Sequence, residues 1–270
     1  MTCEISALYV YPVKACRGIR VARAAVVERG FEADRRWMIV DPNGCFVTQR
    51  EAPQLTLVRT ALDDDGIVLE APGLEPLRLP RTYDEGEDRP CQIWNHQGSA
   101  ARHPEGSAWF SSFFGAPREL VYMGERHQRR VNPERARPTD LVSFADGYPF
   151  LVISEESLSD LNARLAQPIT MERFRPNIVV RGAEPFVEDS FTRVRLGNVT
   201  FRGAKRCDRC VVTTLDPDTG EGGREPLRTL ASYRLWDSKV WFGMNLIHDA
   251  LGELSVGDTV ERLPAAPIST

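Results

Sequence analysis

The sequence predicts a mainly β (α+β) protein, because turn sequences repeatedly separate short runs of β-branched and aromatic residues. Three pairs of such runs predict β-hairpins. The third pair is the clearest, since its apolar residues alternate strictly around a Gly-Asn dipeptide. The paired runs are residues 36–40 with 45–49 around Asp41-Pro42-Asn43-Gly44, 55–62 with 67–71 around Asp63-Asp64-Asp65-Gly66, and 194–196 with 199–201 around Gly197-Asn198.

One further strand and three short helices complete the predicted elements. Residues 5–13 are β-branched and aromatic, and Pro12 marks the end of that strand. No glycine-rich loop opens a helix, which argues against a nucleotide-binding Rossmann or P-loop fold. The predicted helices are one capped by Ser107 with Trp109, Phe110, Phe113 and Phe114 on one face, one capped by Ser154 with Glu155 and Glu156 in its first turn and Leu158, Leu161 and Leu165 at helical spacing, and one opened by Pro226 that runs to about Arg234.

Length, charge and cysteine usage limit the class of protein. A chain of 270 residues corresponds to two domains or one large all-β body. Lys and Arg number 34 and Asp and Glu 38, so the net charge of −4 argues against nucleic acid held by bulk charge. No apolar run is long enough for a membrane helix, and no secretory signal is recognisable at the N-terminus. The six cysteines are therefore expected to be reduced thiols in a cytoplasmic protein.

Residues 117–138 contain six arginines among three prolines and few apolar residues. We expect this stretch to be a loop that connects two β-rich halves. Composition favours a solvated linker. The alternative is an electropositive wall over an anionic ligand.

The segment Lys205-Arg206-Cys207-Asp208-Arg209-Cys210 places cations next to two thiols, and positive charge favours the nucleophilic, metal-binding thiolate. A structural zinc site would need a second pair of ligands, but the four histidines are scattered singly. A thioredoxin-like dithiol would open a helix, whereas the β-branched residues 211–214 predict a strand here. Both of these sites therefore remain only minor alternatives, and two others are favoured. The thiols are simply packed, or one of them binds a soft, redox-active metal carried by an organic cofactor.

A phosphorylated organic cofactor needs cations and amide donors to hold it. Three distant segments offer them: Lys14 between Pro12 and Gly18, Arg35 after Asp34, and Arg175 with Asn177 around a proline. Each cation taken singly is more typical of a solvated face. An Arg-Pro-Asn sequence is nevertheless extended or turned, so both of its polar side chains can point to one place.

Together these segments resemble the MOSC family, whose members carry the molybdenum-cofactor sulfurase C-terminal domain. The resemblance is strongest to the amidoxime-reducing component branch and its bacterial counterparts, and it covers residues of about 5 to 260. The matching motifs, in family order, are YPVKACRG at 11–18, DRRWMIVD at 34–41, FADGYPFLVISEESLSDLN at 144–162, RFRPNIVV at 173–180, KRCDRCVVTTLDPDTG at 205–220, EPLRTLASYR at 225–234 and FGMNL at 242–246.

The resemblance implies an N-terminal β-rich MOSC-associated domain over residues 1–120 and a MOSC β-barrel domain over 121–270, with a few short helices. It also implies a molybdenum cofactor (Mo-molybdopterin) between the domains, with Cys210 rather than Cys207 as the catalytic metal ligand. Ala15 replaces a common serine and keeps only a backbone contact, while Asn245 replaces a tyrosine of the mitochondrial members. The implied cofactor-binding residues are Lys14, Ala15, Arg35, Ala145, Asp146, Gly147, Arg175, Asn177, Asp208, Arg209 and Asn245.

The activity implied by the resemblance is reduction of N-hydroxylated compounds such as amidoximes and hydroxylamino bases. We expect the protein to lack the iron–sulfur domain and the membrane anchor of some relatives and to take its electrons from a separate flavin reductase or ferredoxin-type protein. Family-level descriptions also mention pyridoxal phosphate, to which we assign no residue. The alternatives are a molybdenum cofactor carrier or sulfur-carrier binding protein without turnover, and a purely structural β-protein.

Overall fold

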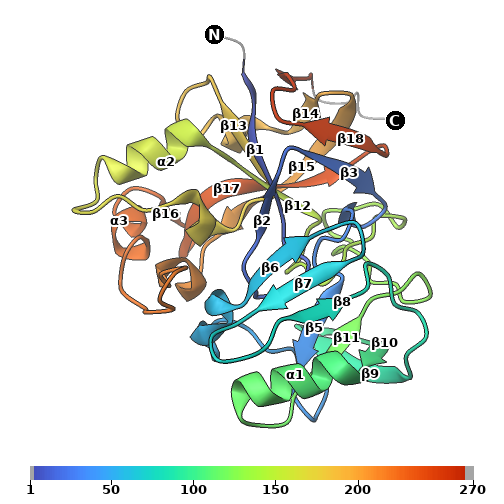
Figure 1. Cartoon of the computed structure of the whole chain (residues 1–270). Helices are drawn as coiled ribbons and strands as arrows, with labels where there is room; N and C mark the ends of the chain where they lie inside the picture. The colour runs from blue at the N-terminus through green and yellow to red at the C-terminus, as the bar shows by residue number, and fades with distance from the viewer. Residues whose placement is uncertain (1–2, 265–270) are drawn as a thin grey trace.

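The computed structural model describes residues 3–264 and has the predicted mainly-β architecture (Figure 1). The largest sheet has nine strands and collects segments from both ends of the chain. All of its neighbouring strands are antiparallel except β12 and β13, which are parallel. In spatial order it contains β19 (Val260–Arg262), β14 (Arg193–Leu196), β15 (Val199–Asp208), β17 (Lys239–His248), β12 (Phe150–Ser154), β13 (Ile178–Arg181), β1 (Glu4–Val10) and β2 (Ile19–Val21), and β16 (Leu235–Trp236) pairs with β17.

Three smaller sheets accompany it, and two of them occupy the lower half of Figure 1 together with α1 (Pro104–Phe114). The other helices are α2 (Glu155–Asn162) and α3 (Leu227–Ala231), both beside the large sheet. The smaller sheets are β5 (Trp37–Val40), β11 (Glu119–Tyr122), β10 (His96–His103) and β9 (Asp88–Ile93); β18 (Gly252–Ser255), β3 (Arg23–Val27) and β4 (Gly30–Phe31); and β6 (Arg59–Leu62), β7 (Ile67–Glu70) and β8 (Leu77–Leu79). Four 3₁₀ helices are η1 (Pro53–Leu57), η2 (Met171–Phe174), η3 (Val187–Ser190) and η4 (Val211–Thr214).

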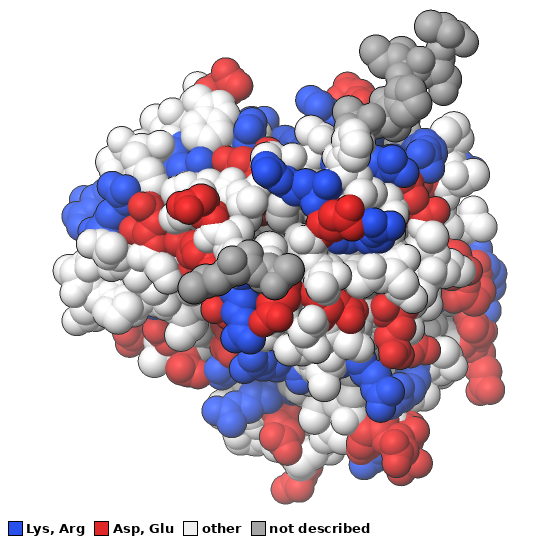
Figure 2. Space-filling view, turned by 90° about the horizontal axis from the view of Figure 1, so that it is seen from above, with Lys and Arg blue, Asp and Glu red and all other residues white. Residues whose placement is uncertain are grey.

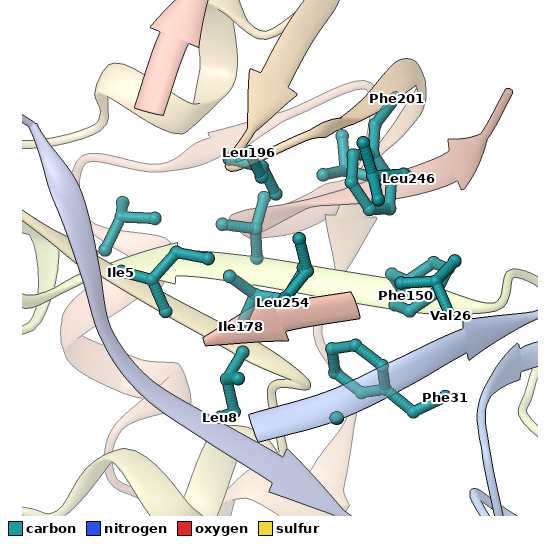
Figure 3. Close-up of a cluster of buried hydrophobic side chains, with 14 of the residues drawn as sticks. Ile5, Leu8, Val26, Phe31, Phe150, Ile178, Leu196, Phe201, Leu246 and Leu254 are labelled. Carbon is teal, nitrogen blue, oxygen red and sulfur yellow. The ribbon is translucent and has the colours of Figure 1, made fainter. Parts of the chain in front are cut away.

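Strands from before and after residue 120 pair with each other in the sheets. The domain boundary at residue 120 stays a prediction. The first strand, β1, pairs with β13, and β3 pairs with β18 near the end of the described chain. Apolar side chains from these strands point toward one another in one core (Figure 3). The N-terminal strands β1 and β2 therefore complete the large sheet, and β3 and β4 form a small separate sheet with β18.

Phe150 lies in that core, fully buried on β12. Its ring makes edge-to-face contacts with Phe31 at 4.9 Å and Phe201 at 5.2 Å between centroids. Phe150→Ala should therefore lower the free energy of unfolding by about 3–5 kcal/mol, the usual cost of deleting a buried phenyl ring. Urea unfolding followed by tryptophan fluorescence measures this change, and Phe114→Ala at the half-buried end of α1 should cost clearly less.

The second and third predicted hairpins are confirmed as β6–β7 and β14–β15, and the first forms only in part. The Asp41 carboxylate accepts the N–H groups of Asn43 and Cys45, so the turn forms, and Val40 makes an antiparallel bridge with Phe46. The return strand ends early, after the Val47 N–H donates to the Ile39 carbonyl, because residues 48–52 coil into the turn that precedes η1. Strand β5 pairs with β11 instead, and the early part of 55–62 is helical.

The helices that begin at Glu155 and after Pro226 are confirmed, although both are shorter than predicted. Ser107 is not a helix cap. Its hydroxyl donates to the His103 carbonyl and accepts the Leu120 N–H, while the His103 ring caps α1 one turn earlier. The β-branched residues 211–214 form η4 rather than a strand, because the hydroxyls of Thr213 and Thr214 bond back to carbonyls three residues before them.

The surface carries acidic and basic side chains interspersed over the face in Figure 2, in keeping with the small net charge. Among residues 3–264, no helix combines the length and the apolar character that crossing a bilayer requires.

Candidate functional site

All twelve residues that the sequence assigns to the site line one cleft, whose empty volume, including its part open to solvent, is about 900 Å³. Most of them come from separate loops, while Asp208 ends β15 and Asn245 lies on β17. The loop after β1 and the loops before β12 and β13 lie at the same end of these three neighbouring strands, and the cysteine segment lies at the end of β15. The lining residues are Lys14, Ala15, Arg35, Ala145, Asp146, Gly147, Arg175, Asn177, Asp208, Arg209, Cys210 and Asn245.

Lys14 reaches into the cleft from the segment after β1. Its backbone N–H is fixed by the Trp37 carbonyl, and its ammonium contacts the Phe144 carbonyl at 2.8 Å and the Asp146 carboxylate at 2.6 Å. Burial lowers the pKa of Lys14, and Asp146 opposes that shift. Lys14 is thus a buried cation with a carboxylate beside it on the open side of the cleft, where the Asp146 side chain remains 69% accessible.

The surrounding protein would raise the pKa of the Asp146 carboxyl, but the Lys14 ammonium outweighs this effect and holds the pKa well below its usual range. A carboxyl group whose pKa is lower in the folded than in the unfolded chain stabilises the fold at pH values above its unfolded-state pKa of about 4. This stabilisation disappears as the pH falls toward the folded-state pKa. Stability of the wild type should therefore drop more between pH 6 and pH 3 than that of Asp146→Asn. Urea midpoints at both pH values test this, and equal slopes would contradict it.

Arg129 fixes the loop that carries Asp146 and corrects the linker interpretation of residues 117–138. Its buried guanidinium donates to the carbonyls of Ser143, Ala145 and Asp146. Burial lowers its pKa to about 10, so it stays charged at neutral pH. The stretch also contains β11, and at Arg129 it is a buried wall behind the cleft rather than a solvated linker.

Arg35 is held by a buried carboxylate that the sequence analysis did not assign to the site. Asp34 is 1% exposed and accepts Arg35 Nη1 at 2.7 Å, the Tyr11 N–H at 2.9 Å and Asn177 Nδ2 at 3.2 Å. Arg35 also donates to Asn177 Oδ1 at 3.0 Å and to the Arg175 carbonyl. Burial raises the pKa of Asp34 despite its partners. This network joins the Arg35 segment to the Arg175–Asn177 segment.

Tyr11 lies between the two arginines. The guanidinium carbons of Arg35 and Arg175 lie 4.1 and 4.4 Å from its ring centroid, and its hydroxyl donates to the Pro176 carbonyl. A Cβ on Gly18 would come within 2.3 Å of that ring, so only glycine fits at this position. The first motif of the family resemblance therefore builds the surface on which both arginines stack.

Three cleft residues have left-handed backbones although none is glycine. Their φ angles are 69° for Ala15, 49° for Arg35 and 54° for Arg175. Such conformations cost free energy and persist where surrounding contacts enforce them, which is common at functional sites. Here the Ala15 carbonyl accepts Gln49 Nε2, and Arg175 donates to the Cys16 carbonyl. Of the extended or turned conformations expected at Arg175, the structure has a turn, in which Arg175 is the left-handed C-cap of η2. Arg175 and Asn177 line the same cleft.

Both thiols of the cysteine segment line the cleft, and each accepts a hydrogen bond from a guanidinium. Arg50 Nη2 lies 3.2 Å from Cys210 Sγ, and Arg209 Nη1 lies 2.9 Å from Cys207 Sγ. Burial raises the pKa of the Cys207 thiol, while Arg209 opposes this shift. Cys210 is the N-cap residue of η4, at the point where the chain leaves the sheet.

Asp208 and Asn245 form the side of the cleft nearest Lys205. The Lys205 ammonium contacts the Asp208 carboxylate at 2.9 Å, and Asn245 Nδ2 donates to the Lys205 carbonyl at 3.1 Å. Burial raises the pKa of Asp208, but Lys205 outweighs it and the pKa is lowered overall. Asp208 is therefore an anion on the edge of the cleft.

The electrostatic balance of the cleft suits an anionic, sulfur-ligated cofactor. Five cationic side chains line it (Lys14, Arg35, Arg50, Arg175 and Arg209) against two carboxylates (Asp146 and Asp208). Arg209 Nε is buried with no hydrogen-bond partner among the described residues, so the cleft retains an unused donor. The described chain holds no group of three or more His, Cys, Asp or Glu side chains arranged for a metal ion. These side chains fit a metal that arrives on an organic, phosphorylated group better than a metal bound by protein alone.

Sequence reasoning missed three residues that contribute to the site. Arg50 is an exposed residue directly after the strand predicted over 45–49, Asp34 directly precedes Arg35, and Arg129 is one of six arginines in the stretch 117–138. No spacing pattern marks Arg50. No pattern in the sequence marks Asp34 as buried either, although a buried carboxylate requires a partner and Arg35 follows it directly.

Comparisons with known proteins agree with this geometry. Residues 2–117 match the family model described as the MOSC N-terminal beta barrel domain, and residues 139–261 match the MOSC domain. The chain is 35% identical to mitochondrial amidoxime reducing component 2 of Rattus norvegicus, over 96% of this chain and 83% of that protein. It is 36% identical to the same protein of Bos taurus, with equal coverage, and 35% identical to mitochondrial amidoxime-reducing component 1 of Homo sapiens, over 96% and 82%. A cleft of basic and thiol side chains in a mainly-β chain with these relatives places the protein in the MOSC family, in the branch of the amidoxime-reducing components.

Proposed function

We propose that this protein is a molybdenum-cofactor-dependent reductase of N-hydroxylated compounds. The observation that supports this proposal most strongly is that Cys210 and five cationic side chains from distant segments line one cleft. The overall reaction takes two electrons and two protons, breaks the N–O bond of an R–NH–OH group, and yields R–NH₂ and water. The names of the 31–36% identical relatives support amidoximes as one substrate class.

The chain's own residues hold and orient the reacting groups. Lys14, Arg35 and Arg175 supply buried positive charge for the phosphate and pterin of the cofactor, and Cys210 supplies one thiolate ligand. The bound cofactor supplies the two-electron redox chemistry. Asn177 and the backbone of Ala15 and Ala145–Gly147 provide uncharged donors and acceptors around it. Asp208 and Asn245 would contact the substrate from the side of the cleft nearest Lys205.

Metal content and turnover together test this proposal. The protein is expressed in a host that synthesises the cofactor, and molybdenum and oxidised pterin are measured per chain. Reduction of a model amidoxime is then followed with reduced viologen as the electron donor. We expect about one molybdenum per chain with amidine formation. Bound cofactor without turnover would favour a cofactor carrier, and absence of both would indicate a structural β-protein.

A further inference from the structure

A basic and aromatic surface lies beside the cleft, on strands β15, β16 and β17. We call it the Trp236 face. It surrounds an open hollow of about 710 Å³. Its residues are Arg135, Lys205, Arg206, Trp236, Asp237, Lys239 and Trp241. The lining holds four cations against one carboxylate, Asp237. Asp208 and Asp189 lie beside two of the cations, and the face still keeps a positive sign, opposite to the net charge of the whole chain.

Much of this positive charge is left without a close carboxylate. Arg135 and Lys239 are exposed and form no ion pair in the described chain. Arg206 is exposed, and its Nε lies 3.5 Å from the Asp189 carboxylate, longer than most ion pairs of this protein. Lys205 alone has a close partner, in Asp208. Exposed cations that lack a close carboxylate attract an acidic protein surface and steer its approach.

The aromatic residues give this face a firm, partly apolar base. The rings of Trp236 and Trp241 stack with centroids 6.0 Å apart at an angle of 23°, and the Trp241 indole N–H donates to the Trp236 carbonyl. Lys205 and Lys239 lie over the Trp241 ring at 5.5 and 5.8 Å. Tryptophan and arginine are the residue types that dominate protein interfaces, whereas isolated surface lysines do not.

The face is joined to the candidate metal ligand by one strand. Arg206 and Cys210 are four residues apart, so their Cα atoms are separated by at most about 14 Å of extended chain. Lys205 belongs to both regions, because its ammonium contacts Asp208 and its carbonyl accepts Asn245 of the cleft wall. A protein seated here would lie next to the cleft without filling it.

We propose that the Trp236 face is the docking surface for a small acidic protein that carries one electron at a time. This inference rests on the proposed reductase function, which requires an external electron source. Each reduced carrier is oxidised by one electron, so two dockings supply the two electrons consumed when one N–O bond is cleaved, and solvent supplies the two protons.

The test uses a small acidic [2Fe–2S] ferredoxin as the probe and the full-length, cofactor-loaded protein. The charge-reversed variant is Arg135→Glu/Lys239→Glu, which alters no residue of the cleft. The matched control is Arg23→Glu, an exposed cation on β3 in a different sheet. Amidoxime reduction is measured with reduced ferredoxin and, separately, with reduced viologen. Binding of the ferredoxin is also titrated directly by NMR line broadening.

We expect the double variant to raise the KM for ferredoxin roughly tenfold or more at low salt, since electrostatic steering changes association rates by about 10–10³. The viologen-driven rate should not change, and Arg23→Glu should resemble the wild type. The KM for ferredoxin should rise with ionic strength in the wild type and much less in the variant.

The outcomes separate the two proposals. If reduced viologen drives no amidoxime reduction, the proposed reductase function is wrong. The docking surface is then tested by the NMR titration alone, which compares ferredoxin binding by the wild type and the double variant. If the double variant binds and uses ferredoxin as the wild type does, the docking proposal is overturned. It is equally overturned if a single-stranded oligonucleotide binds this face more tightly than the ferredoxin, because cations beside stacked indoles would then serve nucleic acid.

Discussion

Cys210→Ala should yield folded protein that retains little molybdenum and reduces amidoximes more than about 100-fold more slowly. Mutation of a residue that only hydrogen-bonds to a metal ligand commonly costs about 10–100-fold in metal affinity or activity, so loss of the ligand itself should cost more. Its sulfur accepts one hydrogen bond, from an exposed arginine, so its removal should leave stability almost unchanged. Molybdenum content, oxidised pterin fluorescence and viologen-driven turnover measure the effect. A urea unfolding curve shows that the variant is folded.

Cys207→Ala is the matched control, since Cys207 lines the same cleft and also contacts a guanidinium. Its loss should lower activity far less than the loss of Cys210. Equal loss of molybdenum from the two variants would indicate a dithiol site instead. Unchanged molybdenum in Cys210→Ala would remove the proposed ligand.

The second large effect concerns stability as well as activity. Asp34→Ala should lower the free energy of unfolding by about 3–5 kcal/mol, because it leaves the nearly buried Arg35 guanidinium without its carboxylate. The same change frees Asn177 and the Tyr11 N–H from their shared acceptor. The loops that carry Arg35 and Arg175 should then shift, and cofactor content should fall with stability.

Two variants make this result interpretable. Asp34→Asn keeps the shape but not the charge, so it should show an intermediate loss of stability. Arg78→Ala removes an exposed arginine from its pair with Asp63 and should cause no comparable loss. Urea unfolding at pH 7 ranks the three variants. If Asp34→Ala were as stable as Arg78→Ala, the buried network would not support the site.

The sequence was most informative where chemistry is local. Turn residues predicted two hairpins correctly, and Ser154 predicted the start of α2, because such signals act within a few residues. The prediction at Ser107 was wrong because the side chain of His103 competes for the same helix end, and a histidine cap is not a common signal.

The site residues were predicted from motifs shared with the family and not from the spacing of residues along the chain. The structure brings those residues together in one cleft. Contacts such as Lys14 with Asp146 span 132 residues, and no periodicity encodes a pair so distant. Arg50 illustrates the limit. It is exposed, stacks on Trp94 at 4.7 Å and reaches Cys210, yet its own neighbours in the sequence contain no sign of either contact.

The pairing of β3 with β18 has a consequence for how the protein is made. Val26 pairs with Gly252, and Arg23 pairs with Ser255. Strand β3 can therefore form this pairing only after more than 220 further residues have been synthesised. At about 5–20 residues per second, a ribosome needs roughly 11–46 s to synthesise the intervening chain. During this interval β3 can pair with β4, but its other edge lacks its native partner, and such an exposed strand edge is open to wrong pairing until β18 emerges.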